Sequence, residues 1–491
     1  MLSQSIGKLS SPNDLPFQII VGCSLGSVFG IASRWISPLL LFGILAAALL
    51  IYYTTLKRPE FVLLGILVLT STIINFYSIP PLPIGIGRLI ITDIALLIPL
   101  GIIFLRVMIE KGFKFIHTPL DLPLLCFYGI AILFTVIAIF QSSITFNQSL
   151  GEMRILSFYL TFFIITNLIR DEQRLRRLLN GIMLLSTLVA LAMIAQYLLG
   201  EAIRILPGRV ETLGTAGITS EGVSRVLPPG QTLVMVGFFS LIVLTIVDRT
   251  QPISMGRFFQ IAILGFSVLL TFNRNFWIGI GLALFIMACL VPIPDKLRLI
   301  KMAILGALLG GIVLVSALIS IRDQSVKLIN ASLTRMATLF NPETLKEESL
   351  RYRYIENSYA LPQIASHPLV GLGLGAHYRP LDLRIDRARI MTYDKLSYIH
   401  NGHLWVLLKT GLIGYVCLLW VLFLHIKRGV QKWRRVSDPF MRGIVLSFSI
   451  MIIAILAAAF VSPLFCVFYW TPVIGIMLGT NEVILRKLRM E

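Results

Sequence analysis

The sequence predicts an all-α, polytopic integral membrane protein, and three observations support this fold class. Hydrophobic residues make up 56% of the 491 positions and charged residues only 14%, with a mean hydropathy of +0.86. Long apolar runs recur along the chain. Basic residues lie between these runs. A soluble domain could not cover its surface with so few charges, whereas a bundle of membrane-spanning helices needs no more.

The apolar runs have the length that a helix needs to cross a bilayer, about 17–25 residues. They predict about 12–14 transmembrane helices, because short neighbouring runs can merge. In chain order, the candidate spans are 16–32, 36–55, 60–77, 88–108, 119–140, 152–168, 174–199, 229–247, 256–272, 274–293, 300–320, 401–424, 441–461 and 464–485.

The basic residues predict the orientation of the bundle. Lys and Arg in short loops collect on the cytoplasmic side of a membrane. Here the basic clusters recur in every second loop, as at Lys57 and Arg58 and at Arg434 and Arg435. Both termini are therefore expected to be cytoplasmic, and the long segment 321–400 is expected to form one large extracytoplasmic loop. The net charge of +19 then indicates attraction to anionic lipid rather than to nucleic acid.

Several polar or reactive residues have a structural explanation. The cysteines all lie within apolar runs without a CxxC or Cys/His cluster, so they are interpreted as small apolar residues. Asp93 lies early in the fourth span, where a carboxylate needs a partner, and we expect it to pair with an arginine.

The segment from Arg351 to Trp405 is polar and carries arginines and histidines, which membrane insertion alone does not require. Much of it belongs to loop 321–400, and loops of that length are usually functional. Residues 351–361 are expected to form a surface helix that Pro362 ends or kinks. The closely spaced glycines that follow would permit a tight backbone path, at Gly371, Gly373 and Gly375.

Two isolated arginines, Arg225 and Arg274, fall on the same predicted outer face. Arg274, in TFNRNFW, fits an interfacial arginine that snorkels to the surface beside aromatic residues. It fits equally a guanidinium that clamps a phosphate, because its planar geometry and permanent charge suit diphosphate recognition. Arg225, in SEGVSRVLPPGQT, is unremarkable by itself. It becomes a candidate because it is predicted to lie on the same face of the membrane as Arg274.

The polar segment offers four further candidates. Arg351 and Arg353 can solvate one face of a surface helix or contact a substrate. Asn401 is a reasonable N-cap for the following apolar helix, and His400 can hydrogen-bond backbone nearby or act as a general base near neutral pH. His403 could share a cation with His400, but the sequence has no HExxH motif and no DxD on the predicted outer side. We therefore expect no metal site and no cofactor.

Taken together, Arg353, HPLVGLGLG at 367–375 and HNGHLWVLLKTGLIG at 400–414, preceded by Arg225 and Arg274, resemble the O-antigen ligase and O-antigen polymerase superfamily of bacterial envelope glycosyltransferases. The resemblance covers about residues 220–425. It divides the chain into N-terminal helices at 1–220, a ligase-like core at 221–425 that includes loop 321–400, and C-terminal helices at 426–491.

The resemblance implies transfer of a glycan from a polyprenyl diphosphate carrier to an acceptor hydroxyl at the outer face of the bacterial plasma membrane, without a metal. Arg225 and Arg274 would bind the diphosphate, and His400 would deprotonate or orient the hydroxyl. Arg353, Arg351 and Asn401 are the candidate substrate-binding residues. The partners would be the lipid-linked glycan, an acceptor glycolipid, glycan or protein, and the lipid bilayer.

Three alternatives stay open at this point. A ligase and a repeat-unit polymerase would need the same donor and the same arginines. A transporter or flippase of lipid-linked glycans would place ionisable residues near the bilayer midplane, whereas here the helix centres are nearly free of charge, with Lys409 as the main exception. A scaffold whose large loop binds a partner would leave the arginines on one face unexplained.

Overall fold

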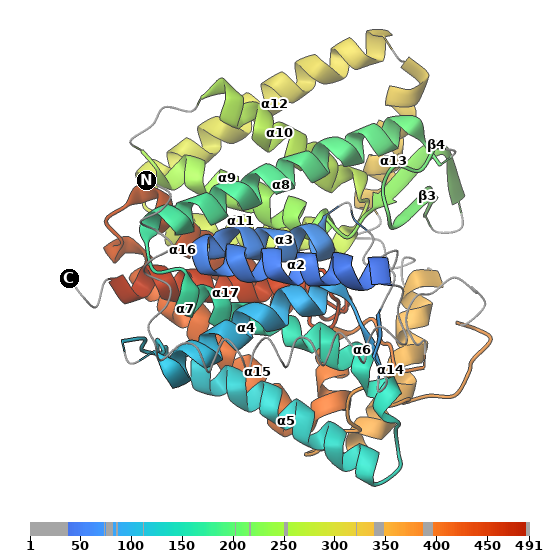
Figure 1. Cartoon of the computed structure of the whole chain (residues 1–491). Coiled ribbons are helices and arrows are strands. Elements are labelled where there is room, and N and C mark those ends of the chain that lie inside the picture. Colours follow the sequence, from blue (N-terminus) through green and yellow to red (C-terminus); the bar gives the residue numbers. More distant parts are fainter. Residues whose placement is uncertain are drawn as a thin grey trace.

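In a computed structural model of the chain, helices dominate and lie side by side along much of their length (Figure 1). The structure describes residues 38–72, 74, 82–84, 87–110, 112–201, 203–215, 218–249, 254–320, 322–337, 348–385 and 396–487.

Within these residues, six helical segments are long and apolar enough to cross a membrane, which confirms the predicted all-α, polytopic fold class. They are α4 (Ile91–Ile109), α5 (Asp121–Phe140), the pair α6 (Phe146–Ser157) and α7 (Thr161–Leu168), α8 (Glu172–Leu199), α15 (Gly402–Lys432) and α16 (Pro439–Ala458). The other helices are α2 (Pro38–Lys57), α3 (Pro59–Ser71), α9 (Gln231–Val247), α10 (Met255–Leu270), α11 (Arg274–Leu290), α12 (Ile293–Ser320), α13 (Arg322–Ala337), α14 (Glu348–Ser366) and α17 (Thr471–Lys487).

Every predicted span after the first coincides with one of these helical segments, while the predicted span 16–32 lies outside the described residues. The apolar helices α3, α9, α10 and α11 have 13 to 17 residues each. They are shorter than the runs of about 20 residues that usually cross a bilayer, so the number of complete crossings stays a prediction.

Helix α9 forms the centre of the bundle, because nearly all of its side chains are buried. It packs against α8, α10, α11 and α16. The hydroxyls of Ser240 on α9 and Ser447 on α16 are 2.6 Å apart, a polar contact between closely packed helices. At the periphery, by contrast, α4 and α5 expose large apolar side chains such as Phe104 and Phe140. This distribution suits a bundle whose outer surface meets lipid.

A β-hairpin that the sequence reading did not anticipate lies at one end of the bundle. Strand β3 (Arg209–Thr215) pairs antiparallel with β4 (Ile218–Leu227), so that Glu211 faces Arg225. A shorter hairpin joins β1 (Leu82–Ile84) to β2 (Gly87–Leu89). In Figure 1, β3, β4, α13 and α14 gather on the right-hand side of the bundle.

The sequence predicted that Pro362 would end or kink its helix, but α14 does not end there. The helix begins at Glu348 and continues through Pro362 to Ser366, so it does not end at the proline. Residues on both sides of the proline are packed into the core, with Ala360 fully buried and Ile364 against its edge. This packing outweighs the hydrogen bond that the proline removes from the helix.

The glycine-rich segment after α14 docks against a break in α15. Gly371, Gly373 and Gly375 all have positive φ, and Gly411 on α15 has φ +61°. The amides of Leu372 and Gly373 donate to backbone carbonyls of α15. A β-carbon at Gly411 would lie 2.1 Å from the carbonyl oxygen of Leu369, so the contact is made by backbone alone.

Two charged side chains lie beneath this joint. Lys409 is fully buried, and its Nζ donates to the carbonyl of Ala376 at 2.5 Å and lies 3.4 Å from Glu152 of α6. Glu152 also accepts the amide of Gly375 at 2.6 Å. Elsewhere, Arg154 forms the expected pair with Asp93 at 2.8 Å. Charged groups inside the bundle are thus paired, as their burial requires.

Candidate functional site

The turn between α10 and α11 is the point on which two arginines converge. Phe272 has φ +46°, and its buried ring packs with residues of β3, β4 and α13. The turn directs two backbone carbonyls at guanidinium groups. Arg225 Nε on β4 donates to Thr271 O at 3.3 Å, and Arg335 Nε on α13 donates to Phe272 O at 3.4 Å. These carbonyls follow a helix end, where they have no partner within the helix.

Arg225 lies in a strongly positive surrounding. Its side chain is 22% exposed, and Glu211, at 3.4 Å, is the carboxylate that pairs with it among the described residues. Burial lowers the pKa of Arg225 to about 10; Glu211 opposes this, and the charges of Arg335, Arg209 and Arg353 add to the lowering. The guanidinium therefore stays charged at neutral pH, although its surroundings disfavour the positive charge.

Arg353 approaches the same region from α14. Its Nε donates to Val461 O at 2.9 Å, in the segment that follows α16. That segment also ties down α11 and α15, because Asn275 Nδ2 donates to Ser462 Oγ at 3.0 Å and the amide of Gly402 donates to Ala459 O at 2.8 Å. We call Arg225, Arg335 and Arg353 the arginine cluster. Helices α11, α14 and α15 thus meet around one short segment, while Arg335 of α13 reaches the turn before α11.

His400 lies just before α15 and is held by Glu356 of α14. Its Nδ1 lies 2.9 Å from both carboxylate oxygens of Glu356, and its backbone amide donates to Oε2 at 2.9 Å. Glu356 is buried, whereas the His400 side chain is 31% exposed. The ring of Tyr398 packs edge-on against the imidazole, with the centroids 4.9 Å apart. Among the described residues, none hydrogen-bonds Nε2.

The other candidates occupy different positions. Arg274 is the first residue of α11, directly after the turn. Arg351 is exposed and forms no hydrogen bond or ion pair with a described residue. Asn401 caps α15, because its Oδ1 accepts the amides of His403 and Leu404 at 3.0 and 3.1 Å. The helix-capping alternative therefore accounts for the oxygen of Asn401.

Arg335 and Glu356 are the two site residues that the sequence reading missed. The sequence spacing could have pointed to Glu356, since it stands three positions after Arg353 and so lies on the same helix face. The sequence does not single out Arg335, because it is one basic residue among other polar residues of a predicted loop. Only the contact between α13 and the α10–α11 turn shows that Arg335 lies near Arg225.

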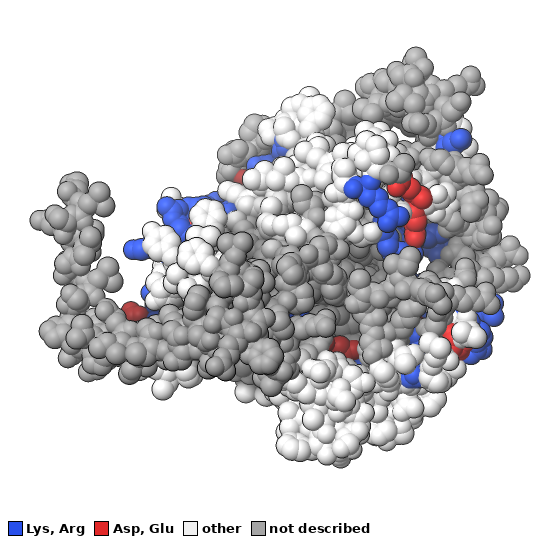
Figure 2. All heavy atoms as spheres, turned by 45° about the vertical axis from the view of Figure 1, so that its right-hand side comes forward, with Lys and Arg blue, Asp and Glu red and all other residues white. Residues whose placement is uncertain are grey.

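Figure 2 turns this end of the molecule toward the reader. On its described surface, charged side chains form small groups, and in several of them Lys or Arg lies beside Asp or Glu. The described residues include no group of three or more His, Cys, Asp or Glu side chains that could hold a metal ion.

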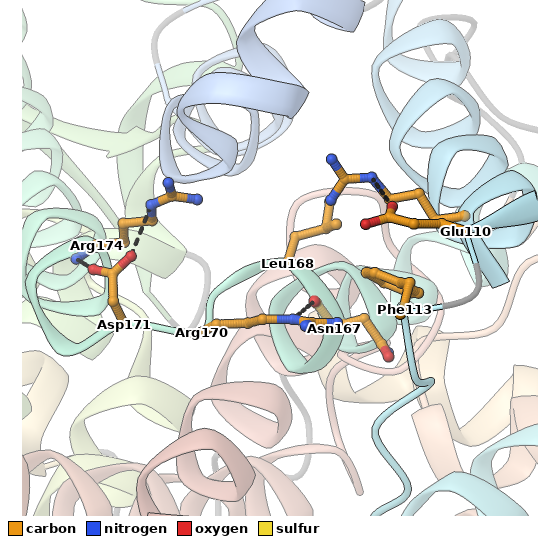
Figure 3. A pocket seen from close by; sticks show the side chains of 9 residues that line it. Glu110, Phe113, Asn167, Leu168, Arg170, Asp171 and Arg174 are labelled. Carbon is orange, nitrogen blue, oxygen red and sulfur yellow. Dashed lines mark hydrogen bonds and ion pairs between the residues drawn. The ribbon is translucent and has the colours of Figure 1, made fainter. Parts of the chain in front are cut away.

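A separate pocket of about 260 Å³ lies at the other end of α8 (Figure 3). The 28 residues of α8 give a length of about 40 Å. Two arginines that line the pocket have partners within it. Arg174 pairs with Asp171 at 2.8 Å, and Arg170 lies over the ring of Phe113 at 4.4 Å and donates to the carbonyl of Asn167. This pocket is therefore distant from the arginine cluster.

The region that contains the candidate site also matches a known protein family. The sequence profile of the family described as O-antigen ligase matches residues 259–419. The matched region contains Arg274, Arg335, Arg353, Glu356 and His400, and lies within the core predicted at 221–425. No curated protein matches the chain. The resemblance inferred from the sequence is thus confirmed, and the chain is an integral membrane protein that carries, at residues 259–419, a domain of the O-antigen ligase family.

Proposed function

We propose that the protein transfers a glycan from a polyprenyl diphosphate carrier to the hydroxyl of an acceptor, in the synthesis of a surface polysaccharide. The observation that carries the proposal is that Arg225 and Arg335 converge on the turn before α11, while Arg353 and Glu356, the partner of His400, lie three positions apart on α14. A cationic site next to an available imidazole nitrogen matches what this transfer requires.

In the proposed reaction, the acceptor oxygen attacks the anomeric carbon of the donor sugar. A new carbon–oxygen bond forms while the bond from that carbon to the diphosphate oxygen breaks. The diphosphate leaves with the bonding electron pair, and His400 Nε2 takes the hydroxyl proton. Arg225 and Arg274, with Arg353 and Arg335, would neutralise the charge that grows on the diphosphate, since guanidinium groups bind phosphate oxygens in a bidentate manner.

Purified protein supplied with a polyprenyl-diphosphate-linked oligosaccharide and an acceptor tests this proposal. Released lipid diphosphate and the glycosylated acceptor should appear together, with and without a chelator. His400→Ala should lower the rate by roughly 10²–10⁴-fold, the usual contribution of a general base, while donor binding persists. Normal turnover in both His400→Ala and Arg225→Ala would contradict the proposed chemistry.

The same assay separates the related activities. A ligase adds one glycan block to a different molecule, whereas a polymerase lengthens its own product, so product length distinguishes them. Movement of intact donor across a liposome membrane without release of lipid diphosphate would instead support a transporter or flippase. The polar groups of the described site gather at one end of the bundle, which favours transfer over transport.

A further inference from the structure

We infer that Glu356 is a positioning residue for His400, which holds the imidazole in the tautomer that presents an unprotonated Nε2 to the acceptor hydroxyl. The inference rests on the proposed function and adds to it a carboxylate that orients the imidazole. Its basis is the contact of one buried carboxylate with both the ring and the backbone of His400.

The tautomer follows from the donor and acceptor roles of the groups. An ionised carboxylate only accepts hydrogen bonds. Nδ1 of His400 lies 2.9 Å from Oε1 and from Oε2 of Glu356, so Nδ1 must carry the hydrogen. In the neutral ring the lone pair then lies on Nε2, the nitrogen that points away from Glu356 and is able to receive a proton.

The position of Glu356 is well determined by its surroundings. The side chain is 6% exposed and projects from α14, whose Ile355 and Ala360 are buried. A carboxylate removed from water needs compensating donors, and the amide and ring N–H of His400 supply two. The amide contact also fixes the backbone at His400, so the ring is restrained in both orientation and location.

The contact has a further consequence during transfer. When Nε2 takes the proton of the acceptor hydroxyl, the imidazole becomes a cation. Glu356 then forms an ion pair with this cation at the existing distance, and no group has to move. A carboxylate that orients a histidine and stabilises its charged form is a known way to strengthen a general base.

Glu356→Gln tests the inference with little change in shape. Glutamine can turn either its oxygen or its NH₂ group toward Nδ1, so the tautomer is no longer enforced. We expect kcat to fall by about 10–10³-fold while KM for the lipid-linked donor changes less than threefold. Glu356→Asp, which keeps the charge, should recover part of the rate. Tyr354→Phe is the matched control, because Tyr354 lies on the same helix with 76% exposure and should retain full activity.

A second measurement distinguishes positioning from a purely structural role and needs no turnover. Protein labelled with ¹⁵N-histidine should show His400 with a protonated Nδ1 and an unprotonated Nε2 above neutral pH, with the signal identified by its loss in His400→Gln. In Glu356→Gln the two tautomers should mix. An unchanged tautomer signal in Glu356→Gln would overturn the inference, as would an unchanged kcat.

The two proposals can fail separately. If the wild-type protein shows the enforced tautomer but releases no lipid diphosphate from any donor, the glycosyltransferase proposal fails while Glu356 still orients His400. If transfer proceeds but kcat is unaffected by Glu356→Gln, the transfer proposal stands and the role of Glu356 is wrong.

Discussion

At the scale of single residues, the arginine cluster shows how one set of side chains can serve structure and chemistry together. The Nε atoms of Arg225, Arg335 and Arg353 are each engaged with a backbone carbonyl. These bonds fix the direction of the three guanidinium groups before any ligand arrives. Preorganised donors of this kind bind a developing charge without further reorganisation.

Arg335 gives the first test at this scale. Loss of one hydrogen bond to a charged group costs about 1.5–3 kcal/mol, which corresponds to roughly 10–150-fold in affinity. We therefore expect Arg335→Ala to weaken donor binding by this factor, and Arg335→Lys to restore only part of it because the planar fork is lost. Binding of a fluorescent polyprenyl diphosphate would measure the effect. Arg58→Ala, at an exposed arginine outside the site, should bind normally.

The pH dependence of donor binding follows from the lowered pKa of Arg225. This group is cationic below its pKa of about 10, so its contribution to binding is fully present at neutral pH and is lost as the pH rises through that value. We expect affinity to decline above roughly pH 9.5 in the wild type. In Arg225→Ala, affinity should be lower throughout, and this decline should be absent. An identical decline in both proteins would assign it to another group.

At the scale of elements, α14 links the two halves of the site. Arg353 and Glu356 lie three positions apart on the same face; one contacts Val461 and the other contacts His400. Any displacement of α14 would therefore disturb Arg353 and His400 together. This coupling gives a physical reason for the surface helix within a loop that membrane insertion does not need.

The joint between the glycine-rich segment and α15 has little tolerance for side chains. Gly411→Ala would place a β-carbon against the carbonyl of Leu369 and force a non-glycine residue to φ +61°. The backbone conformation alone costs about 1–3 kcal/mol. We expect a lower midpoint of thermal unfolding in detergent, followed by intrinsic fluorescence.

Gly281 of α11 provides the matched control for this change. An added β-carbon there would meet nothing within 4 Å, and alanine favours a helix interior by up to about 1 kcal/mol over glycine. Gly281→Ala should therefore leave the midpoint unchanged or raise it. Equal destabilisation by both substitutions would contradict the proposed role of the joint.

The elements also show what the sequence could and could not predict. Helices were predictable because membrane spans carry a strong, continuous hydropathy signal. The β3–β4 hairpin was missed because its strands pack against α8, α10 and α13, and such contacts leave no periodic pattern. Pro362 does not end α14 for a related reason, since tertiary packing holds the helix together through the proline. His400, Arg225 and Arg353 stood out as polar residues in an apolar chain, whereas Arg335 needed three-dimensional contacts.

At the scale of the whole molecule, the hairpin and the pocket of Figure 3 lie at opposite ends of α8. The positive-inside pattern predicts that the hairpin lies outside and that the pocket lies on the cytoplasmic side. In a variant without native cysteines, we expect a cysteine at Thr212 of the hairpin to react with an impermeant maleimide in intact cells. A cysteine at Arg174 should react only after permeabilisation. The reverse result would invert the proposed topology.

The buried pair of Lys409 and Glu152 has a consequence for how the protein is made. An unpartnered lysine at the centre of a membrane helix costs about 2.5–3.5 kcal/mol, so α15 carries a penalty when it leaves the ribosome alone. Glu152 precedes Lys409 in the chain, and α6 is therefore synthesised before α15 needs its partner. We therefore expect α15 to insert at a lower cost once α6 is in place. Because His400 directly precedes α15, we expect this proposed general base to take its position only when α15 has docked against α6.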